Sequence, residues 1–181
     1  MNDNISRGLM IGRFQPFHKG HLSLARQILQ ECDELIIAIG SAQLNYSYKD
    51  PFTAGERIMM IHMALEEANI DMNRCYLVPV VNDENNARWF GHLRSMVPYF
   101  DILYSGNEFV TTLVSGKTNI VKPRFSRKQE YNGTNIRKLM SRSLTWKKLV
   151  PDSVSRFIEE IDGVTRVRNL LRVSVRAKST T

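Results

Sequence analysis

Short apolar runs alternate with longer amphipathic segments along this chain. The apolar runs predict five strands, at residues 7–12, 33–40, 75–81, 101–105 and 120–122. The segments between them predict helices at 18–31, 88–96, 107–114 and 133–142. The capping box Thr53-Ala54-Gly55-Glu56 predicts the start of another helix, at 53–68. Alternating strands and helices are typical of a parallel sheet with helices on both faces and right-handed crossovers. We therefore expect an α/β fold, Rossmann-like, with a doubly wound parallel sheet.

After residue 150 the alternation of strands and helices gives way to helices alone. Beyond Pro151, two amphipathic segments predict helices at 152–161 and 164–175, with Gly163 between them, and we expect 176–181 to fray. A length of 181 residues suits one domain with a small C-terminal appendage. The expected organisation is an α/β domain over 1–150 and C-terminal helices, 151–181, packed on the same domain.

Composition is that of an ordinary globular protein, with 43% hydrophobic and 24% charged residues. The longest apolar run, 35–39, is far too short to cross a bilayer, and no signal peptide precedes the first strand. Cys32 and Cys75 lack metal-binding or redox spacing and are predicted to be buried thiols. We therefore expect a cytoplasmic protein with no membrane association.

The net charge of +7 is concentrated between residues 122 and 148. One acid, Glu130, accompanies nine basic residues there: Lys122, Arg124, Arg127, Lys128, Arg137, Lys138, Arg142, Lys147 and Lys148. A nucleotide site could use two or three of them, and the others suit a solvated face or a surface with incidental affinity for nucleic acid. No helix-turn-helix, RNP or zinc-finger pattern indicates specific nucleic-acid binding.

The most informative segment joins the first strand to the first helix: Gly12-Arg13-Phe14-Gln15-Pro16-Phe17-His18-Lys19-Gly20-His21. A strand, a turn and a helix in succession direct backbone N–H groups and the positive helix end toward a phosphate. His18 and His21 lie three apart, so both can face one anion, and Gly20 allows close backbone approach to a ligand.

This segment resembles the G-x-F-x-P-x-H-x-G-H signature of the nucleotidyltransferase superfamily. A second segment, Tyr131-Asn132-Gly133-Thr134-Asn135-Ile136-Arg137, resembles that superfamily's S-S/G-T-x-x-R motif, with Asn132 in place of the usual serine. The resemblance implies that both motifs hold the phosphates of ATP. The catalytic residues that it implies are Arg13, His18, His21 and Arg137.

Nucleotidyl transfer needs positioning and stabilisation of negative charge, because the attacking phosphate is already ionised at neutral pH. Histidine and arginine donors suit that chemistry. No His, Cys or carboxylate spacing indicates a metal cage, so we expect Mg²⁺ to be carried by the ATP phosphates. Asp83 and Glu84 are the acids that could orient substrate or metal-bound water.

Further segments, at 40–43, 50–57, 86–89 and 104–107, make residues 6–172 similar to the archaeal-type nicotinamide-nucleotide adenylyltransferases. The reaction implied is transfer of the adenylyl group of ATP to nicotinamide mononucleotide (NMN), giving NAD and pyrophosphate. A homo-oligomer, often a hexamer, is the family precedent. The implied ATP-binding residues are Gly12, Arg13, Phe14, His18, His21, Tyr104, Ser105, Gly106, Asn107, Gly133, Thr134 and Arg137.

The NMN-binding residues implied by the resemblance are Ser41, Lys49, Asn86 and Trp89. An indole is a good face for a cationic pyridinium, and an Asn amide complements a carboxamide. Lys49 stands where the family usually has an arginine, in the polar and aromatic segment 41–52, a candidate active-site loop.

Two other functions remain open from the residues. Another small transferase of this fold could act on a pantetheine phosphate, FMN or a polyol phosphate, but those substrates lack the pyridine carboxamide that Asn86 and Trp89 suit. A nonenzymatic nucleic-acid-binding module would bind through the basic 122–148 stretch in a salt-sensitive manner, without ATP turnover.

Overall fold

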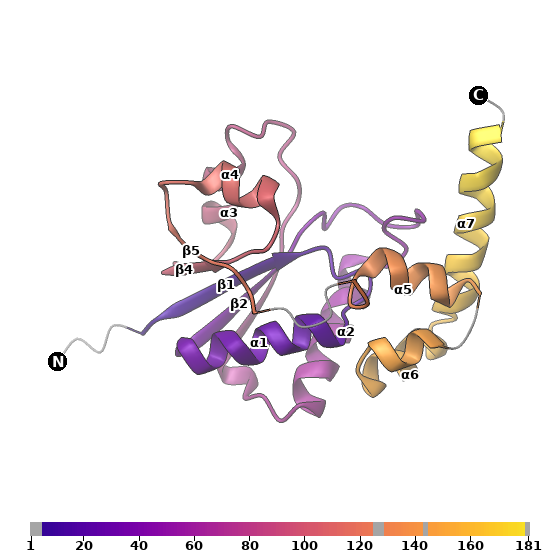
Figure 1. Ribbon diagram of the computed structural model, residues 1–181, viewed down its shortest axis with the longest axis horizontal. Coiled ribbons are helices and arrows are strands. Elements are labelled where there is room, and N and C mark those ends of the chain that lie inside the picture. Colours follow the sequence, from indigo (N-terminus) through magenta and orange to yellow (C-terminus); the bar gives the residue numbers. More distant parts are fainter. Residues whose placement is uncertain (1–4, 125–128, 143–144, 180–181) are drawn as a thin grey trace.

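A five-stranded, fully parallel sheet forms the centre of the protein (Figure 1). The computed structural model describes residues 5–124, 129–142 and 145–179. The sheet has the order β3-β2-β1-β4-β5. Its strands are β1 (Arg7–Gly12), β2 (Glu34–Ile39), β3 (Cys75–Pro79), β4 (Ile102–Tyr104) and β5 (Asn119–Val121). The chain winds outward from β1 in one direction and from β4 in the other, so the topological switch point lies between β1 and β4.

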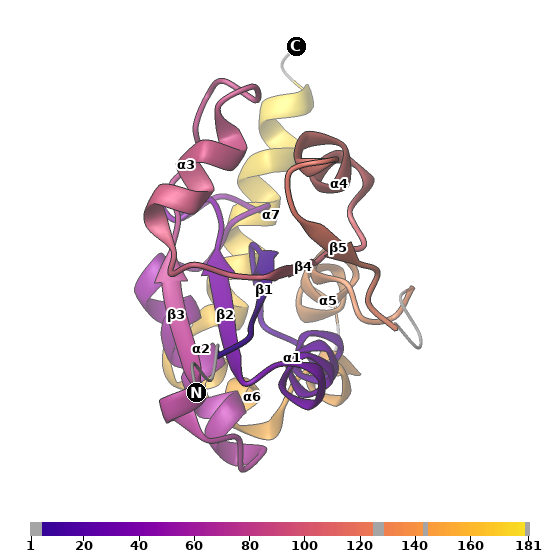
Figure 2. The same ribbon diagram turned by 90° about the vertical axis from the view of Figure 1, so that its left-hand side faces the viewer.

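Helices cover both faces of the sheet, which confirms the doubly wound α/β prediction (Figures 1 and 2). One face carries α1 (Lys19–Glu31) and α2 (Ala54–Glu67), and the other carries α3 (Trp89–Met96) and α4 (Glu108–Val114). The C-terminal part contains α5 (Gly133–Met140), α6 (Asp152–Glu160) and α7 (Gly163–Ser179). Two short 3₁₀ helices, η1 (Met72–Arg74) and η2 (Thr145–Leu149), were not predicted.

Alternating side chains of the strands feed two separate cores. Leu35, Ile37 and Ile39 of β2 join the cluster beneath α1 and α2, whereas Ile36 and Ala38 join the cluster beneath α3 and α4. This is the period of two expected of a strand buried on both faces. The apolar run therefore predicts β2 correctly, with each end within one residue of the observed bound.

The C-terminal helices belong to the α1–α2 side of the molecule. Val154 and Ile158 of α6 and Val167 of α7 are buried in the same cluster as the α2 side chains. The Glu67 carboxylate at the end of α2 accepts hydrogen bonds from the backbone N–H groups of Asp152 (3.3 Å) and Ser153 (2.7 Å), which cap α6. A domain boundary at residue 150 stays a prediction.

Two expectations from the sequence were wrong. Helix α7 continues to Ser179 where fraying was expected from residue 176, because its last turns contain no Gly or Pro to end the helix; residues 180–181 lie outside the described residues. Cys32 is buried, but Cys75 is only partly buried because it begins the edge strand β3. No helix in the described part of the chain is long and apolar enough to cross a membrane.

Candidate active site

The two histidines of the first motif cap α1 reciprocally. His18 is the N-cap residue, and its Nδ1 accepts a hydrogen bond from the His21 N–H at 3.3 Å. The His21 Nδ1 accepts one from the His18 N–H, also at 3.3 Å. Their rings stack with centroids 3.4 Å apart and planes within 14°. The motif thus builds a capping box out of two imidazoles, where Ser or Thr with Glu is usual.

This arrangement fixes the protonation state of both imidazoles. Burial lowers the pKa of His18 to about 3 and lowers the pKa of His21 well below its usual range. Both rings are therefore neutral at pH 7. Because each Nδ1 accepts a backbone hydrogen bond, the proton of each ring lies on Nε2, which is left as a donor. The Nε2–H groups of His18 and His21 are therefore two oriented hydrogen-bond donors on uncharged rings.

Gly20 allows another segment of the chain to approach α1. A Cβ atom at this position would lie 2.9 Å from the Cβ of Tyr131, the first residue of the second motif. The room that was expected to admit a ligand is taken by Tyr131. The glycine therefore brings the two motifs together.

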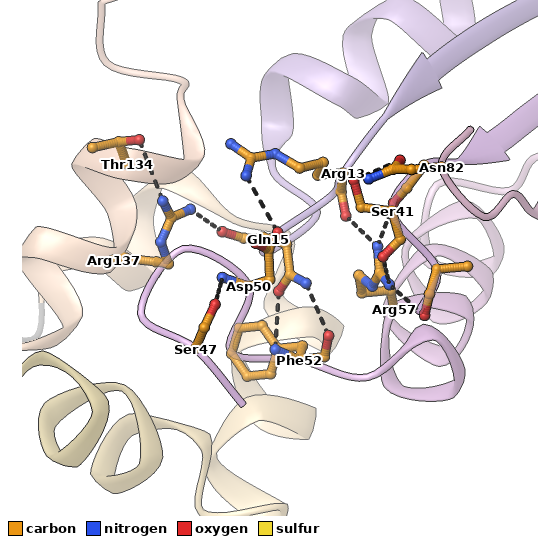
Figure 3. Close-up of polar contacts among 12 residues, drawn as sticks. Arg13, Gln15, Ser41, Ser47, Asp50, Phe52, Arg57, Asn82, Thr134 and Arg137 are labelled. Carbon is orange, nitrogen blue, oxygen red and sulfur yellow. Dashed lines mark hydrogen bonds and ion pairs between the residues drawn. The ribbon is translucent and has the colours of Figure 1, made fainter. Parts of the chain in front are cut away.

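The second motif begins α5 and meets the first at Gln15 (Figure 3). The Arg137 guanidinium is buried and donates to the carbonyl of Gln15 at 2.8 Å and to the Thr134 hydroxyl at 3.3 Å. Its Nε has no hydrogen-bond partner among the described residues, and burial lowers its pKa. Asn132 takes the N-cap position and accepts from the Asn135 N–H at 2.8 Å, so the substitution for serine keeps the cap.

Two cavities open where these motifs meet, beyond the carboxyl ends of the strands. The smaller, of about 160 Å³, is polar and is lined by Arg13, Phe14, Gln15, His18, His21, Gly133, Thr134 and Arg137. The larger, of about 410 Å³, lies at the switch point between β1 and β4. Its lining includes Met10, Ile11, Tyr104, Ser105, Gly106, Asn107, Pro123 and Tyr131, together with the two histidines. The two cavities share Arg13, His18, His21 and Gly133.

The residues expected to bind ATP are thus brought together by the fold. Every one of them but Gly12 lines one of the two cavities. Gly12 lies behind the site, where an added Cβ would come within 3.1 Å of the Phe14 ring. The convergence expected of polar residues that follow parallel strands is therefore observed for this set, beyond the carboxyl ends of β1 and β4.

The residues expected to bind NMN occupy neighbouring loops, and none of the four lines either cavity. Ser41 follows β2, is buried with a positive φ of 52°, and donates to Asn82 Oδ1 at 3.1 Å. Lys49 is exposed, and its side chain has no hydrogen bond or ion pair within the described residues. Asn86 is exposed, and Trp89 is partly buried against the α3–α4 cluster.

The acids suspected in the loop after β3 are already engaged or exposed. Asp83 accepts from the Asn85 N–H at 2.8 Å and pairs with Arg88 at 3.2 Å, and Glu84 is exposed. Among the described residues, no group of three or more His, Cys, Asp or Glu side chains is placed to hold a metal ion. The donor set consists of N–H groups and guanidinium cations, which suits a metal brought in by nucleotide phosphates.

Of the nine basic residues between 122 and 148, Arg127 and Lys128 lie outside the described residues.

Sequence reasoning missed Arg57, the buried arginine of α2. Its side chain is fully buried, and its guanidinium donates to backbone carbonyls of Thr53, Arg13, Gly40, Ser41 and Ala42 at 2.8–3.5 Å (Figure 3). It therefore joins the turns that follow β1 and β2. Its burial could have been predicted from helical spacing, because Arg57 lies on the same face of α2 as the buried Met60, Ile61 and Ala64.

Gln15 was quoted only as part of the motif, yet its side chain positions the loop after β2. Its amide donates to the Phe52 carbonyl at 2.8 Å and accepts from the Phe52 N–H at 3.0 Å. Arg13, beside it, donates to the buried carboxylate of Asp50 at 3.3 Å. The 41–52 loop is thereby tied to the first motif.

Comparison with known proteins identifies the class. The cytidylyltransferase-like family model matches residues 9–139, which span both motifs. The fold and the site therefore define a nucleotidyltransferase, and an enzyme. A bifunctional NMN adenylyltransferase/ADP ribose pyrophosphatase from Francisella tularensis, solved with AMP and a manganese ion, shares the fold with a TM-score of 0.77 at 22% identity. That similarity covers 93% of this chain and 52% of the Francisella chain.

Relatives narrow the class further. The nicotinamide-nucleotide adenylyltransferase of Caldivirga maquilingensis is 47% identical over 167 residues, which cover 91% of this chain and 94% of the relative. That of Methanococcus maripaludis strain C5 is 47% identical over 165 residues, covering 91% and 95%. The chain belongs to the nicotinamide-nucleotide adenylyltransferase family.

Proposed function

We propose that the protein transfers the adenylyl group of ATP to the 5′-phosphate of NMN, giving NAD and pyrophosphate. The observation that carries this proposal is the smaller cavity, where two neutral imidazole donors and two arginines line one polar space. That space adjoins a larger cavity at the switch point, which has room for a nucleoside.

The chemistry requires positioning of two phosphates and stabilisation of charge. A phosphate oxygen of NMN forms a bond to the α-phosphorus of ATP, and the bond from that phosphorus to the bridging oxygen of the β-phosphate breaks. Pyrophosphate leaves with the bonding electron pair. Mg²⁺ carried by the ATP phosphates would neutralise part of their charge.

His18, His21, Arg13 and Arg137 are the residues proposed to stabilise this reaction. Neutral imidazoles donate hydrogen bonds to nonbridging phosphate oxygens, and their strength grows as charge accumulates in the transition state. Arg137 is held by Gln15 and Thr134, so it reaches the transition state already oriented. No general base is required, because the attacking phosphate is ionised at neutral pH.

The adenosine of ATP is proposed to occupy the larger cavity. Tyr104, Ser105, Gly106 and Asn107 line it, and they follow β4, on one side of the switch point. The triphosphate would then extend past the histidines toward Gly133 and Thr134 at the start of α5, where backbone N–H groups favour an anion.

The acceptor half is proposed to lie over the loops after β2 and β3. There Trp89 would stack on the nicotinamide ring, and Asn86 would form hydrogen bonds with its carboxamide. Ser41 and Lys49 would contact the 5′-phosphate of NMN. Support comes from the family and from the shared edge of the sheet to which these loops belong. We further propose, from the family precedent, a homo-oligomer, with a hexamer as the specific expectation, acting in the cytoplasm.

The test is an acceptor panel. Purified protein is incubated with ATP, Mg²⁺ and one acceptor at a time: NMN, its deamidated analogue, pantetheine phosphate or FMN. When NMN is the acceptor, pyrophosphate and NAD should be formed together, and a His21→Ala variant should form both far more slowly. Turnover with pantetheine phosphate or FMN and none with NMN would overturn the proposal.

A further inference from the structure

The loop that follows β2 is held from the side of the first motif. Gln15 forms two hydrogen bonds with the Phe52 backbone, and Arg13 pairs with Asp50. On the α5 side, the Arg137 guanidinium lies 5.9 Å from the centroid of the Tyr48 ring. These contacts all come from residues within 9–139, the part matched by the family model.

A separate contact comes from α7, in the C-terminal helical segment. Arg166 Nη1 donates to both carboxylate oxygens of Glu56, at 2.8 and 2.7 Å, and to the Pro51 carbonyl at 3.3 Å. The same guanidinium lies 5.1 Å from the Tyr46 ring centroid and 5.9 Å from that of Phe52. One side chain therefore touches both ends of the segment 46–52 and the first turn of α2.

The start of α7 is built to bring this arginine close. A Cβ at Gly163 would lie 2.9 Å from the Phe52 ring, so only glycine lets α7 approach that ring so closely. Tyr46, at the other end of the segment, has a positive φ of 49°. Such a backbone costs energy for a residue with a side chain and persists where surrounding contacts hold it. Arg166 supplies one of them.

The neighbouring arginines of α7 lack such contacts. Arg168 and Arg172 are exposed, and within the described residues their side chains form no hydrogen bond or ion pair. Arg166, in contrast, is mostly buried, with 19% of its side chain exposed. The difference shows that Arg166 has a specific place in the loop and is more than a member of a basic surface.

We infer that Arg166 is a positioning residue for the acceptor half of the site: it holds segment 46–52 so that Lys49 is presented in one arrangement. This inference rests on the proposed function, because it assigns segment 46–52 to NMN. The physical basis is preorganisation, since a loop ordered before binding does not spend binding free energy on becoming ordered. The ATP-binding residues His18, His21 and Arg137 have their hydrogen bonds outside segment 46–52, so the loss of Arg166 should affect the two substrates unequally.

The test compares Arg166→Gln with Arg168→Gln, which makes the same change on the same helix. Steady-state kinetics give the KM for NMN and for ATP, and amide hydrogen exchange of peptides covering 44–53 reports the order of the loop. For Arg166→Gln we expect about a tenfold rise in the KM for NMN, a change of less than twofold in the KM for ATP, and faster exchange in 44–53. Arg168→Gln should match the wild type in all three.

A conservative variant separates positioning from general stability. Arg166→Lys keeps the charge opposite Glu56 and should recover most of the affinity for NMN. Equal rises in both KM values, or unchanged loop exchange in Arg166→Gln, would overturn the inference. If the wild type forms no NAD from NMN and ATP, the proposed function fails by itself, and the exchange measurement still decides whether Arg166 orders the loop.

Discussion

His18 and His21 accept hydrogen bonds from each other's backbone, each through Nδ1 at 3.3 Å. The relationship makes each imidazole part of the helix cap and leaves its Nε2 proton for another partner. Structure and proposed chemistry therefore depend on the same two side chains. Their separate contributions can be measured, because rate and stability respond differently to substitution.

Replacement of His21 by alanine should lower kcat about a hundredfold, with a smaller effect on KM. The reason is that a preset donor to an oxyanion-like phosphate contributes roughly 3 kcal/mol to transition-state stabilisation. Steady-state kinetics with NMN and ATP give the values. His62→Ala, on the exposed side of α2, is the matched control and should leave kcat unchanged. Near-normal turnover in His21→Ala would show that the motif is structural.

Mild acid should destabilise the protein through these histidines. The folded-state pKa of His18, about 3, lies below the unfolded value near 6.5, and that of His21 is also lowered. Between those values the unfolded chain binds more protons, so stability is full above pH 6.5 and falls as pH decreases toward the folded-state pKa. We expect His18 to contribute a loss of about 1 kcal/mol per pH unit between pH 6.5 and 5, and His21 to add a loss of the same sign.

Urea unfolding at several pH values measures this slope. His18→Asn keeps an N-cap side chain but removes one titrating group, so stability should fall less steeply with decreasing pH than in the wild type. Identical slopes for the two proteins would show that His18 does not stay neutral in the folded state.

Trp89→Ala should weaken NMN binding by about 1–2 kcal/mol while leaving ATP binding nearly intact. Only the pyridinium is proposed to stack on the indole. Titration calorimetry with each nucleotide separately gives the two affinities. Trp89→Phe keeps an aromatic face and should lose less. An equal loss for both nucleotides would assign Trp89 to the α3–α4 core that it already contacts.

Lys49→Ala should raise the KM for NMN and leave the KM for ATP unchanged, because this exposed point charge is proposed to lie near the acceptor phosphate alone. Lys49→Arg should preserve or improve the KM for NMN, since a guanidinium adds bidentate geometry. Steady-state kinetics on both variants provide the measurement. If the alanine variant keeps its KM for NMN, Lys49 is only a solvated charge of the loop.

Removal of the Arg57 guanidinium should lower the free energy of unfolding by at least about 3 kcal/mol. Arg57→Met leaves the carbonyls of Arg13, Gly40 and Ser41 without their buried donor, and each such orphan costs about 1–3 kcal/mol. Urea unfolding measures the change, with Arg26→Met, an exposed arginine of α1, as control. Equal stability of the Arg57 variant and the control would show that water replaces the guanidinium without penalty.

Local patterns were enough to predict much of the fold. The apolar run in β2 and the capping box Thr53–Glu56 gave element bounds close to those observed. Both signals are local, because a strand buried on two faces and a helix cap each depend on neighbouring residues. The end of α7 was less predictable, since no Gly or Pro marks it.

The two motifs, 12–21 and 131–137, were also evident from the sequence, because residue identity and spacing determine which groups can bind phosphate. The sequence by itself determined the parallel sheet, the donor chemistry and the family. Only the tertiary structure decided how these groups are held: Tyr131 fills the room beside Gly20, Arg57 joins two turns, and Arg166 reaches segment 46–52. The physical reason is sequence separation. Arg166 and Glu56 are 110 positions apart, and their contact depends on how α7 packs against α5 and α6, which no local pattern encodes.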